Sequence, residues 1–197
     1  MSFVDNLVAV LTFNKEKMGK LADDSAATMQ GILVLIVSAI VSVLPNLLTY
    51  LDSNSTSAEK NTALTFMVTD LLTVILIVFL VAGLMAFVLR GLGANATMAQ
   101  TFRVFSFAEV WSLIAGVLVV VSGVATLSLV GYLSLVSLII GVMAYSGASV
   151  AKSIVAVIIT YIIAFIIVFI IIIILLLVFF TALINSLAGS TAVVLAL

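Results

Sequence analysis

The hydrophobic pattern of this chain consists of long apolar stretches separated by short polar segments. A transmembrane helix needs about 20 apolar residues, and the stretches that qualify cover residues 30–50, 71–89, 107–148 and 153–184. The run over 107–148 is about twice the length of one span, so we place a turn near Ser128 to Gly131. The pattern therefore predicts five spans. Unbroken apolar runs favour helices over the alternating strands of a membrane β-barrel.

Composition supports the same architecture. Hydrophobic residues make up 65% of the 197 residues and charged residues only 8%, whereas soluble domains are about a quarter charged. We therefore predict an all-α, polytopic transmembrane bundle in the cell membrane. Its expected parts are a cytoplasmic amphipathic and juxtamembrane segment, a five-helix transmembrane domain and a short external tail, at residues 1–29, 30–184 and 185–197.

The distribution of basic residues predicts the orientation. With the N-terminus inside, the expected cytoplasmic segments hold Lys15, Lys17, Lys20, Arg90, Arg103 and Lys152, and Lys60 is the basic residue that falls outside. Cytoplasmic loops of membrane proteins carry an excess of Lys and Arg. The pattern thus predicts an N-in, C-out topology, which agrees with an odd number of spans.

The segment before the first span has the features of an interfacial helix. Ser2 and Asp5 have capping-box spacing, and Asn14 is placed to cap a second helical turn. The segment has an apolar face, formed by Phe3, Leu7, Val10 and Leu11, and after it a group of lysines, Lys15, Lys17 and Lys20. Such a helix either binds anionic lipid at the inner leaflet or serves as an ordinary juxtamembrane anchor.

Two polar segments lie between the early spans. Residues 52–69 read as an outer loop, and Asn54-Ser55-Thr56 is an N-glycosylation sequon on the side where it would be modified. On the inner side, Thr97 and Gln100 have capping-box spacing. They predict a short helix that leads into the third span.

The residues that are absent exclude several kinds of chemistry. The chain has no Cys and no His, which removes disulfides, thiolate metal sites and the usual general base near neutral pH. With a net charge of −1 and no basic patch, nucleic acid is not expected as a partner. We expect no catalytic residue, no cofactor and no metal site, and hence no enzyme.

Glu109 is the acidic residue placed at the inner mouth of the third span. Ionisable residues within a membrane are functional candidates by default. In one interpretation Glu109 is a proton or cation site of a small transporter. In the other it lies in the headgroup zone and forms an ion pair with Arg103 or Lys152, and we favour that interpretation because no second acid is expected at mid-membrane depth.

Small residues recur at helical spacing in the third and fourth spans. The main positions are Ser134, Ser137, Gly141, Ala144 and Ala148 in the fourth span and Ser112 and Ala115 in the third. Small faces allow helix backbones to approach closely. We therefore predict a tight antiparallel hairpin of these two spans. A substrate path lined by hydroxyl groups is the functional alternative.

These features together resemble the Yip1 family. The resemblance rests on the segment from Leu11 to Leu21 (LTFNKEKMGKL), on Gly91 to Gly116, and on Gln100 to Ala108 (QTFRVFSFA) within it. It implies a five-span membrane protein similar to the short prokaryotic members. The chain departs from the family pattern at Asn14 and at Trp111, where prolines would be expected. The vesicle-transport role of eukaryotic members is not implied.

The favoured function is a non-enzymatic membrane protein that acts through helix–helix association. It would serve as a scaffold, an accessory subunit or in membrane organisation, with other membrane proteins or further copies of itself as partners, and with anionic lipid at the inner leaflet. The alternative is a small transporter or channel with Glu109 as its ion or proton site. Mid-membrane charges or broken helices would favour that alternative.

Overall fold

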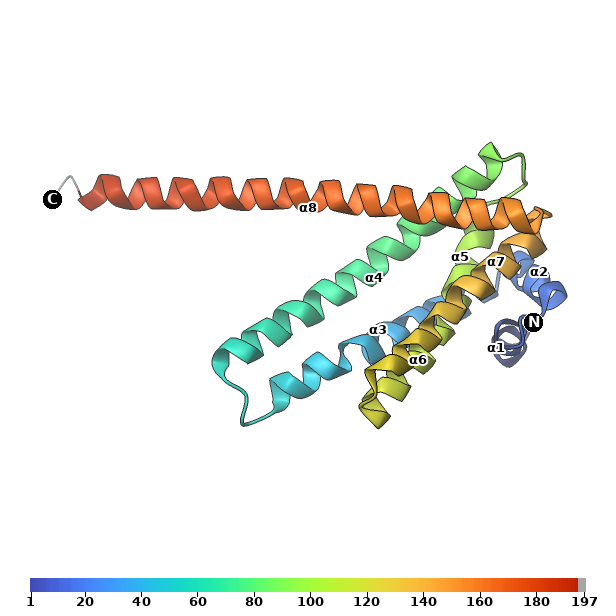
Figure 1. Cartoon of the computed structure of the whole chain (residues 1–197), viewed down its shortest axis with the longest axis horizontal. Coiled ribbons are helices and arrows are strands. Elements are labelled where there is room, and N and C mark those ends of the chain that lie inside the picture. Colours follow the sequence, from blue (N-terminus) through green and yellow to red (C-terminus); the bar gives the residue numbers. More distant parts are fainter. Residues whose placement is uncertain (195–197) are drawn as a thin grey trace. The chain divides into compact units, whose positions relative to one another are not determined.

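The chain folds into helices separated by short connections. The computed structural model describes the backbone of residues 1–194, and the side chains of these except at 70–73, 75, 125–128, 179 and 182–194. Helix makes up 85% of the structure. In chain order (Figure 1) the elements are α1 (Phe3–Leu11), α2 (Lys15–Asp23), α3 (Ala27–Leu51), α4 (Ser57–Gly91), α5 (Met98–Ala108), α6 (Val110–Ser122), the 3-10 helix η1 (Ala125–Tyr132), α7 (Leu133–Ser146) and α8 (Val150–Val194).

Four segments of the described chain are long and apolar enough to cross a membrane. They are Ala27–Leu51, Met98–Ser122, Leu129–Ser146 and Val150–Val178. A shorter apolar segment, Leu76–Gly91, lies within α4. The prediction of an all-helical, multi-pass membrane protein is therefore confirmed. The third spanning segment begins at Met98 rather than near Phe107, because α5 and α6 follow each other with only Glu109 between them.

Local capping signals begin several helices where the sequence predicted them. The Ser2 hydroxyl accepts a hydrogen bond from the Asp5 amide at 3.1 Å, and the Asn14 side chain accepts one from the Lys17 amide at 3.0 Å. Thr97 and Gln100 form a complete capping box at the start of α5. In each case a side-chain oxygen satisfies an amide that has no partner within the helix.

The predicted outer loop is shorter than the polar composition of residues 52–69 suggested. α4 begins at Ser57, because Thr56 and Glu59 form a capping box in which the Glu59 carboxylate accepts from the Thr56 amide at 2.6 Å. The connection between α3 and α4 is therefore a tight turn. Asn54 lies exposed within it, where its amide donates to the Asp52 carboxylate at 2.9 Å.

The reversal after the third span starts earlier than predicted. α6 ends at Ser122, and Gly123 follows in the left-handed conformation at φ 69°. That conformation strains a residue with a Cβ atom, so glycine ends the helix here. η1 then packs back along α6 and leads into α7. The predicted turn at Ser128 to Gly131 falls within η1, and the side chain of Ser128 lies outside the described ones.

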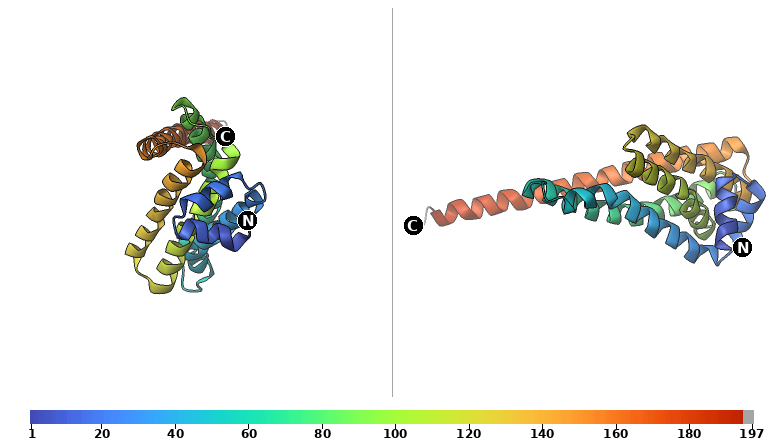
Figure 2. Two further views of the ribbon diagram at one scale, coloured as in Figure 1. Left: turned by 90° about the vertical axis from the view of Figure 1, so that its right-hand side faces the viewer. Right: turned by 90° about the horizontal axis from the view of Figure 1, so that it is seen from below.

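α1 and α2 form an N-terminal layer that packs on α5 and α7 (Figure 2). Ala9 and Val10 of α1, and Met18, Leu21 and Ala22 of α2, are fully buried. The opposite edge of α1 is apolar as well and remains exposed, at Phe3, Val4 and Val8. The segment therefore packs on the bundle with one face and presents an exposed apolar edge with the other.

The chain divides into two compact units, Met1–Thr160 and Tyr161–Leu197. In the first unit, the start of α8 packs through buried side chains, and the Thr160 hydroxyl donates to the sulfur of Met85 at 3.5 Å. The second unit consists of the rest of α8, whose apolar composition suits lipid on all sides. α8 continues to Val194, so most of the predicted tail at 185–197 is helical, and residues 195–197 lie outside the described part.

Candidate functional site

Glu109 lies at the one-residue break between α5 and α6. Its backbone ends α5 and begins α6, at φ −64° and ψ −9°. The Glu109 amide donates to the Phe105 carbonyl at 3.2 Å. Its own carbonyl accepts from the Leu113 amide at 3.0 Å and from the Ser38 hydroxyl at 3.4 Å. A side chain of α3 therefore supports the third span at the point where the helix is irregular.

This position is central in both helices that meet there. Ser38 lies about 17 Å from the start of α3 at Ala27 and about 20 Å from its end at Leu51, taking 1.5 Å per residue. Glu109 is likewise near the middle of the spanning segment Met98–Ser122. The sequence-based expectation of a headgroup-zone position instead began the third span close to Glu109 itself.

A cavity of about 270 Å³ lies beside Glu109. Its polar lining consists of the Glu109 side chain and three serines: Ser38 and Ser42 from α3, and Ser112 from α6. The rest of the lining is apolar and comes from α3, α4, α5 and α6, namely Leu35, Val41, Val74, Ile77, Val78, Phe105 and Gly116. The site is therefore a carboxyl group with three hydroxyls inside an otherwise apolar wall.

Arg103 does not pair with Glu109, and that prediction is wrong. The Arg103 guanidinium donates instead to the Thr28 hydroxyl at 2.8 Å and to the Ala22 carbonyl at 2.6 Å. The other candidate partner, Lys152, donates to the Leu92 carbonyl at 3.1 Å. Arg103 thus donates to a carbonyl, that of Ala22, in the last turn of α2, where a positive charge is favourable.

The small residues of the fourth span pack inside the chain. A Cβ atom added at Gly141 would overlap Val104 of α5 and approach Met18 of α2 to 3.2 Å. Ala144 contacts Gly19 of α2 in the same way, at 3.7 Å from an added Cβ. α7 therefore packs against the α5 half of the third spanning segment and against α2, while the α6 half packs mainly on η1.

The remaining predicted positions have separate environments. Ser137 is fully buried and accepts a hydrogen bond from the Trp111 indole at 2.9 Å. Ala115 and Ala148 are buried, and Ser134 is half-buried. Ser112 lines the Glu109 cavity and also lies, with Ala115, against Gly131 of η1, where an added Cβ would meet them at 3.7–3.9 Å. The small-residue pattern thus combines close helix packing with one wall of the cavity.

The sequence analysis missed Ser38 and Ser42. A signal was present, because these two hydroxyl residues are four apart in an otherwise apolar span and so share a helix face. It also missed Gly19 and Met18 as packing partners of α7. The partner of a small face that lies more than 100 residues away along the chain cannot be read from either segment alone.

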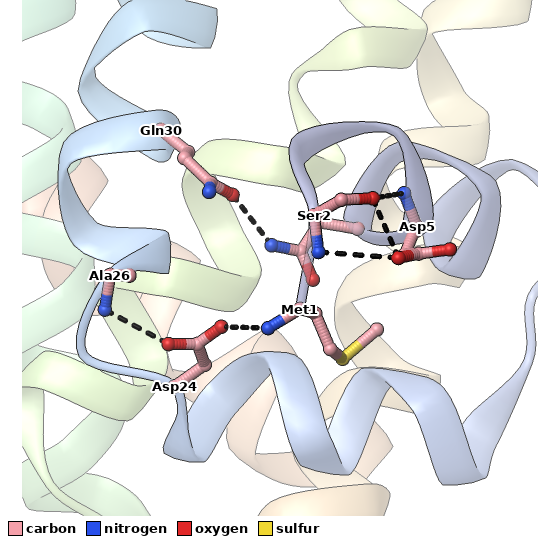
Figure 3. A network of polar contacts seen from close by, with 7 residues as sticks. Met1, Ser2, Asp5, Asp24, Ala26 and Gln30 are labelled. Atoms are coloured by element: carbon pink, nitrogen blue, oxygen red, sulfur yellow. Dashed lines mark hydrogen bonds and ion pairs between the residues drawn. The ribbon is translucent and has the colours of Figure 1, made fainter.

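The N-terminal layer carries its own polar network (Figure 3). Asn6 is fully buried and donates to the Gln30 side chain at 2.7 Å. The Ser2 hydroxyl and amide lower the pKa of Asp5, and the N-terminal ammonium of Met1, followed by the Ala26 amide, lowers the pKa of Asp24. These carboxylates stay ionised near neutral pH. They fix α1 and the turn before α3.

The comparisons with known proteins give no relative for this chain. No family model, no curated protein and no solved structure matches it. The resemblance to the Yip1 family therefore stays a prediction.

Proposed function

We propose that this chain acts through association in the membrane, as a scaffold or accessory subunit for other membrane chains or for further copies of itself. The observation that carries the proposal is the N-terminal layer on α5 and α7. The layer buries a full set of apolar side chains and leaves Lys15, Lys17 and Lys20 exposed. The layer carries these lysines beside Asp5, Glu16, Asp23 and Asp24, and its exposed lysines suit a protein that holds partners and anionic headgroups at the inner leaflet.

The proposed topology has five spans with the N-terminus inside. α4 supplies the second span: its 35 residues make a helix of roughly 52 Å, long enough to cross a bilayer at a tilt. The N-terminal layer and Arg103 then lie on the cytoplasmic side, and the turn with Asn54 lies outside. The excess of basic residues on the inner side supports this orientation.

Single cysteines test the orientation without background, because the chain has no native Cys. In intact cells, cysteines at Asn14→Cys and Gly93→Cys should resist an impermeant maleimide. Cysteines at Ser57→Cys and Ser190→Cys should react with it. Labelling after permeabilisation provides the control for each site, and the reverse pattern in intact cells would reject the N-in topology.

Transport through the Glu109 cavity is the second candidate function. Glu109 lies near the middle of the segment Met98–Ser122 and lines a cavity, which favours that candidate, since ion paths in membranes use ionisable groups. The two candidates make different predictions for the pure protein.

We expect liposomes that contain the pure protein to show no flux of protons, cations or small solutes above that of empty liposomes. Native mass spectrometry from mild detergent should show a homo-oligomer or a stable partner chain. The matched comparison is Glu109→Gln. A robust flux in the parent protein that is lost in this variant would replace association by transport as the function.

A further inference from the structure

The Glu109 carboxyl lacks a cationic partner. Among the described side chains, the ion pairs are Met1 with Asp24 and Lys20 with Glu16. Ser112 lines the same cavity as Glu109, but a hydroxyl does not neutralise charge. An ionised carboxylate within a spanning helix is costly unless a positive charge compensates it. The Glu109 carboxylate must therefore be neutralised either by a proton or by a bound cation.

Two hydroxyls of the cavity donate their protons to backbone carbonyls and can therefore accept from, or bind, a ligand. Ser38 gives its proton to the Glu109 carbonyl, and Ser42 gives its proton to the Ala39 carbonyl at 2.8 Å. The lone pairs of both oxygens thus stay free. Together with the carboxylate they form a set of oxygen donors without nitrogen or sulfur. Hard cations prefer such a set.

Because of Pro45, a backbone carbonyl of α3 next to the same site has no hydrogen-bond donor within the helix. Proline has no N–H to give to the carbonyl four residues earlier, so the Val41 carbonyl lacks its usual partner within α3. A second cavity of about 330 Å³ is lined by Pro45 and shares Val41, Ser42 and Ser112 with the first. Backbone carbonyls freed in this way are common ligands of Na⁺ in membrane proteins.

Charge and size select the class of cation. A single carboxylate is neutralised by one positive charge, whereas a divalent ion would leave a net charge in an apolar wall. A volume of about 270 Å³ has room for an ion with several waters, which take about 30 Å³ each. We propose that the cavity beside Glu109 binds a small monovalent cation of the sodium type, held by the Glu109 carboxylate and the hydroxyls of Ser42 and Ser112. This site goes beyond the proposed function, because binding requires no transport.

Protons compete for the same carboxylate, and among the described side chains the other charged groups near it are engaged elsewhere. α3 and α6 contain no Asp, Glu, Lys or Arg. On α5, Arg103 is bound to Thr28 and Ala22. On α4, Arg90 donates to the Ala96 carbonyl, Glu59 and Lys60 lie in the first turn at the far end, and the side chain of Asp70 lies outside the described ones. Sodium binding should therefore weaken as the pH falls and Glu109 takes up a proton.

Trp111 provides a direct readout of the site. It is the single Trp of the chain and lies two residues after Glu109. Its indole donates to Ser137, and its ring stacks on Phe13 at 5.5 Å. A change of charge at Glu109 should alter its emission.

The experiment is a titration of the purified protein in detergent at pH 8. NaCl replaces choline chloride at constant ionic strength while Trp111 fluorescence is recorded, and binding of radioactive sodium is measured in parallel. We expect a saturable response with one sodium per chain in the parent protein. Glu109→Gln should lose it, Ser112→Ala should weaken the apparent affinity about fivefold, the loss of one hydrogen bond, and the surface variant Glu16→Gln should match the parent.

Circular dichroism checks that Glu109→Gln and Ser112→Ala keep the parent helix content, and the Ser112 variant preserves the test where the other fails to fold. A parent protein that responds to pH but not to sodium would overturn the proposal in favour of a proton alone. An unchanged sodium response in folded Glu109→Gln would also overturn it. Sodium binding without flux in liposomes would leave the proposed association function intact, while flux would reject that function and not the site.

Discussion

A Gly141→Leu variant is expected to melt well below the parent protein in detergent. A side chain at this position has no space, since its Cβ atom alone would overlap Val104 and approach Met18. Leucine must therefore push α7 away from α5 and α2. Overpacking of this kind costs about 1–3 kcal/mol, and two displaced helices place this site toward the upper end. Thermal unfolding followed by circular dichroism measures the loss.

The control is Ile172→Leu in the apolar second unit. Ile172 is about half exposed. The change exchanges one apolar side chain for another of the same volume, so the melting temperature should barely move. Equal shifts in the two variants would show that Gly141 does not lie at a close helix contact. A third variant, Gly91→Ala, has no atom within 4 Å of the added Cβ and should be tolerated.

Replacing Arg103 by alanine is expected to release the N-terminal layer. The guanidinium joins α5 to the end of α2 and to the first turn of α3 through its bonds to Ala22 and Thr28. Hydrogen bonds to a charged group contribute about 1.5–3 kcal/mol each, so the loss of both should reach about 3–6 kcal/mol. Trypsin should then cleave faster at Lys15, Lys17 and Lys20, which the parent protein holds in a packed helix.

Arg90→Ala is the matched control, because Arg90 is exposed and makes a single bond, to the Ala96 carbonyl at 2.9 Å. It should leave the cleavage rate at α2 unchanged. Arg103→Lys should be intermediate, since lysine keeps the charge but not the fork of donors that reaches two acceptors. If trypsin cleaves α2 at the same rate in Arg103→Ala and Arg90→Ala, Arg103 does not hold the layer in place.

Local signals predicted where three of the helices, α1, α2 and α5, begin. Ser2, Asn14 and Thr97 each start a helix, because a cap acts within one turn and is therefore visible in a few consecutive residues. The start of α4 was missed, although Thr56 and Glu59 have the same spacing. The polar composition around them was interpreted as a loop, but polar residues in the first turns of a helix are compatible with its extension beyond the membrane.

The position of Arg103 shows the limit of hydropathy. A charged residue interrupts an apolar window, so the sequence suggested that the third span starts after it. In the structure the same residue is satisfied by Ala22 and Thr28, about 80 and 75 positions earlier, and the helix continues through it. Because those partners are distant along the chain, the pattern around Arg103 could not reveal them.

The same difference in the helix boundary changes the place of Glu109 along its helix. With the start of the helix moved to Met98, the acid becomes central and faces hydroxyls of α3. The sequence identified Glu109 itself as a candidate, since its chemistry is visible without a fold. The arrangement of Ser38, Ser42 and Ser112 around it depends on how α3 packs on α6, which no single segment specifies.

The packing of Gly19 against Ala144 has a consequence for the order of assembly during synthesis. The ribosome makes α2 before every span, yet its partner α7 emerges more than 100 residues later, on the order of 10 s at usual translation rates. During that interval the apolar faces of α1 and α2 have no complete surface to cover them. The apolar faces of α1 and α2 therefore stay partly uncovered until α7 is made, and this part of the bundle closes only then.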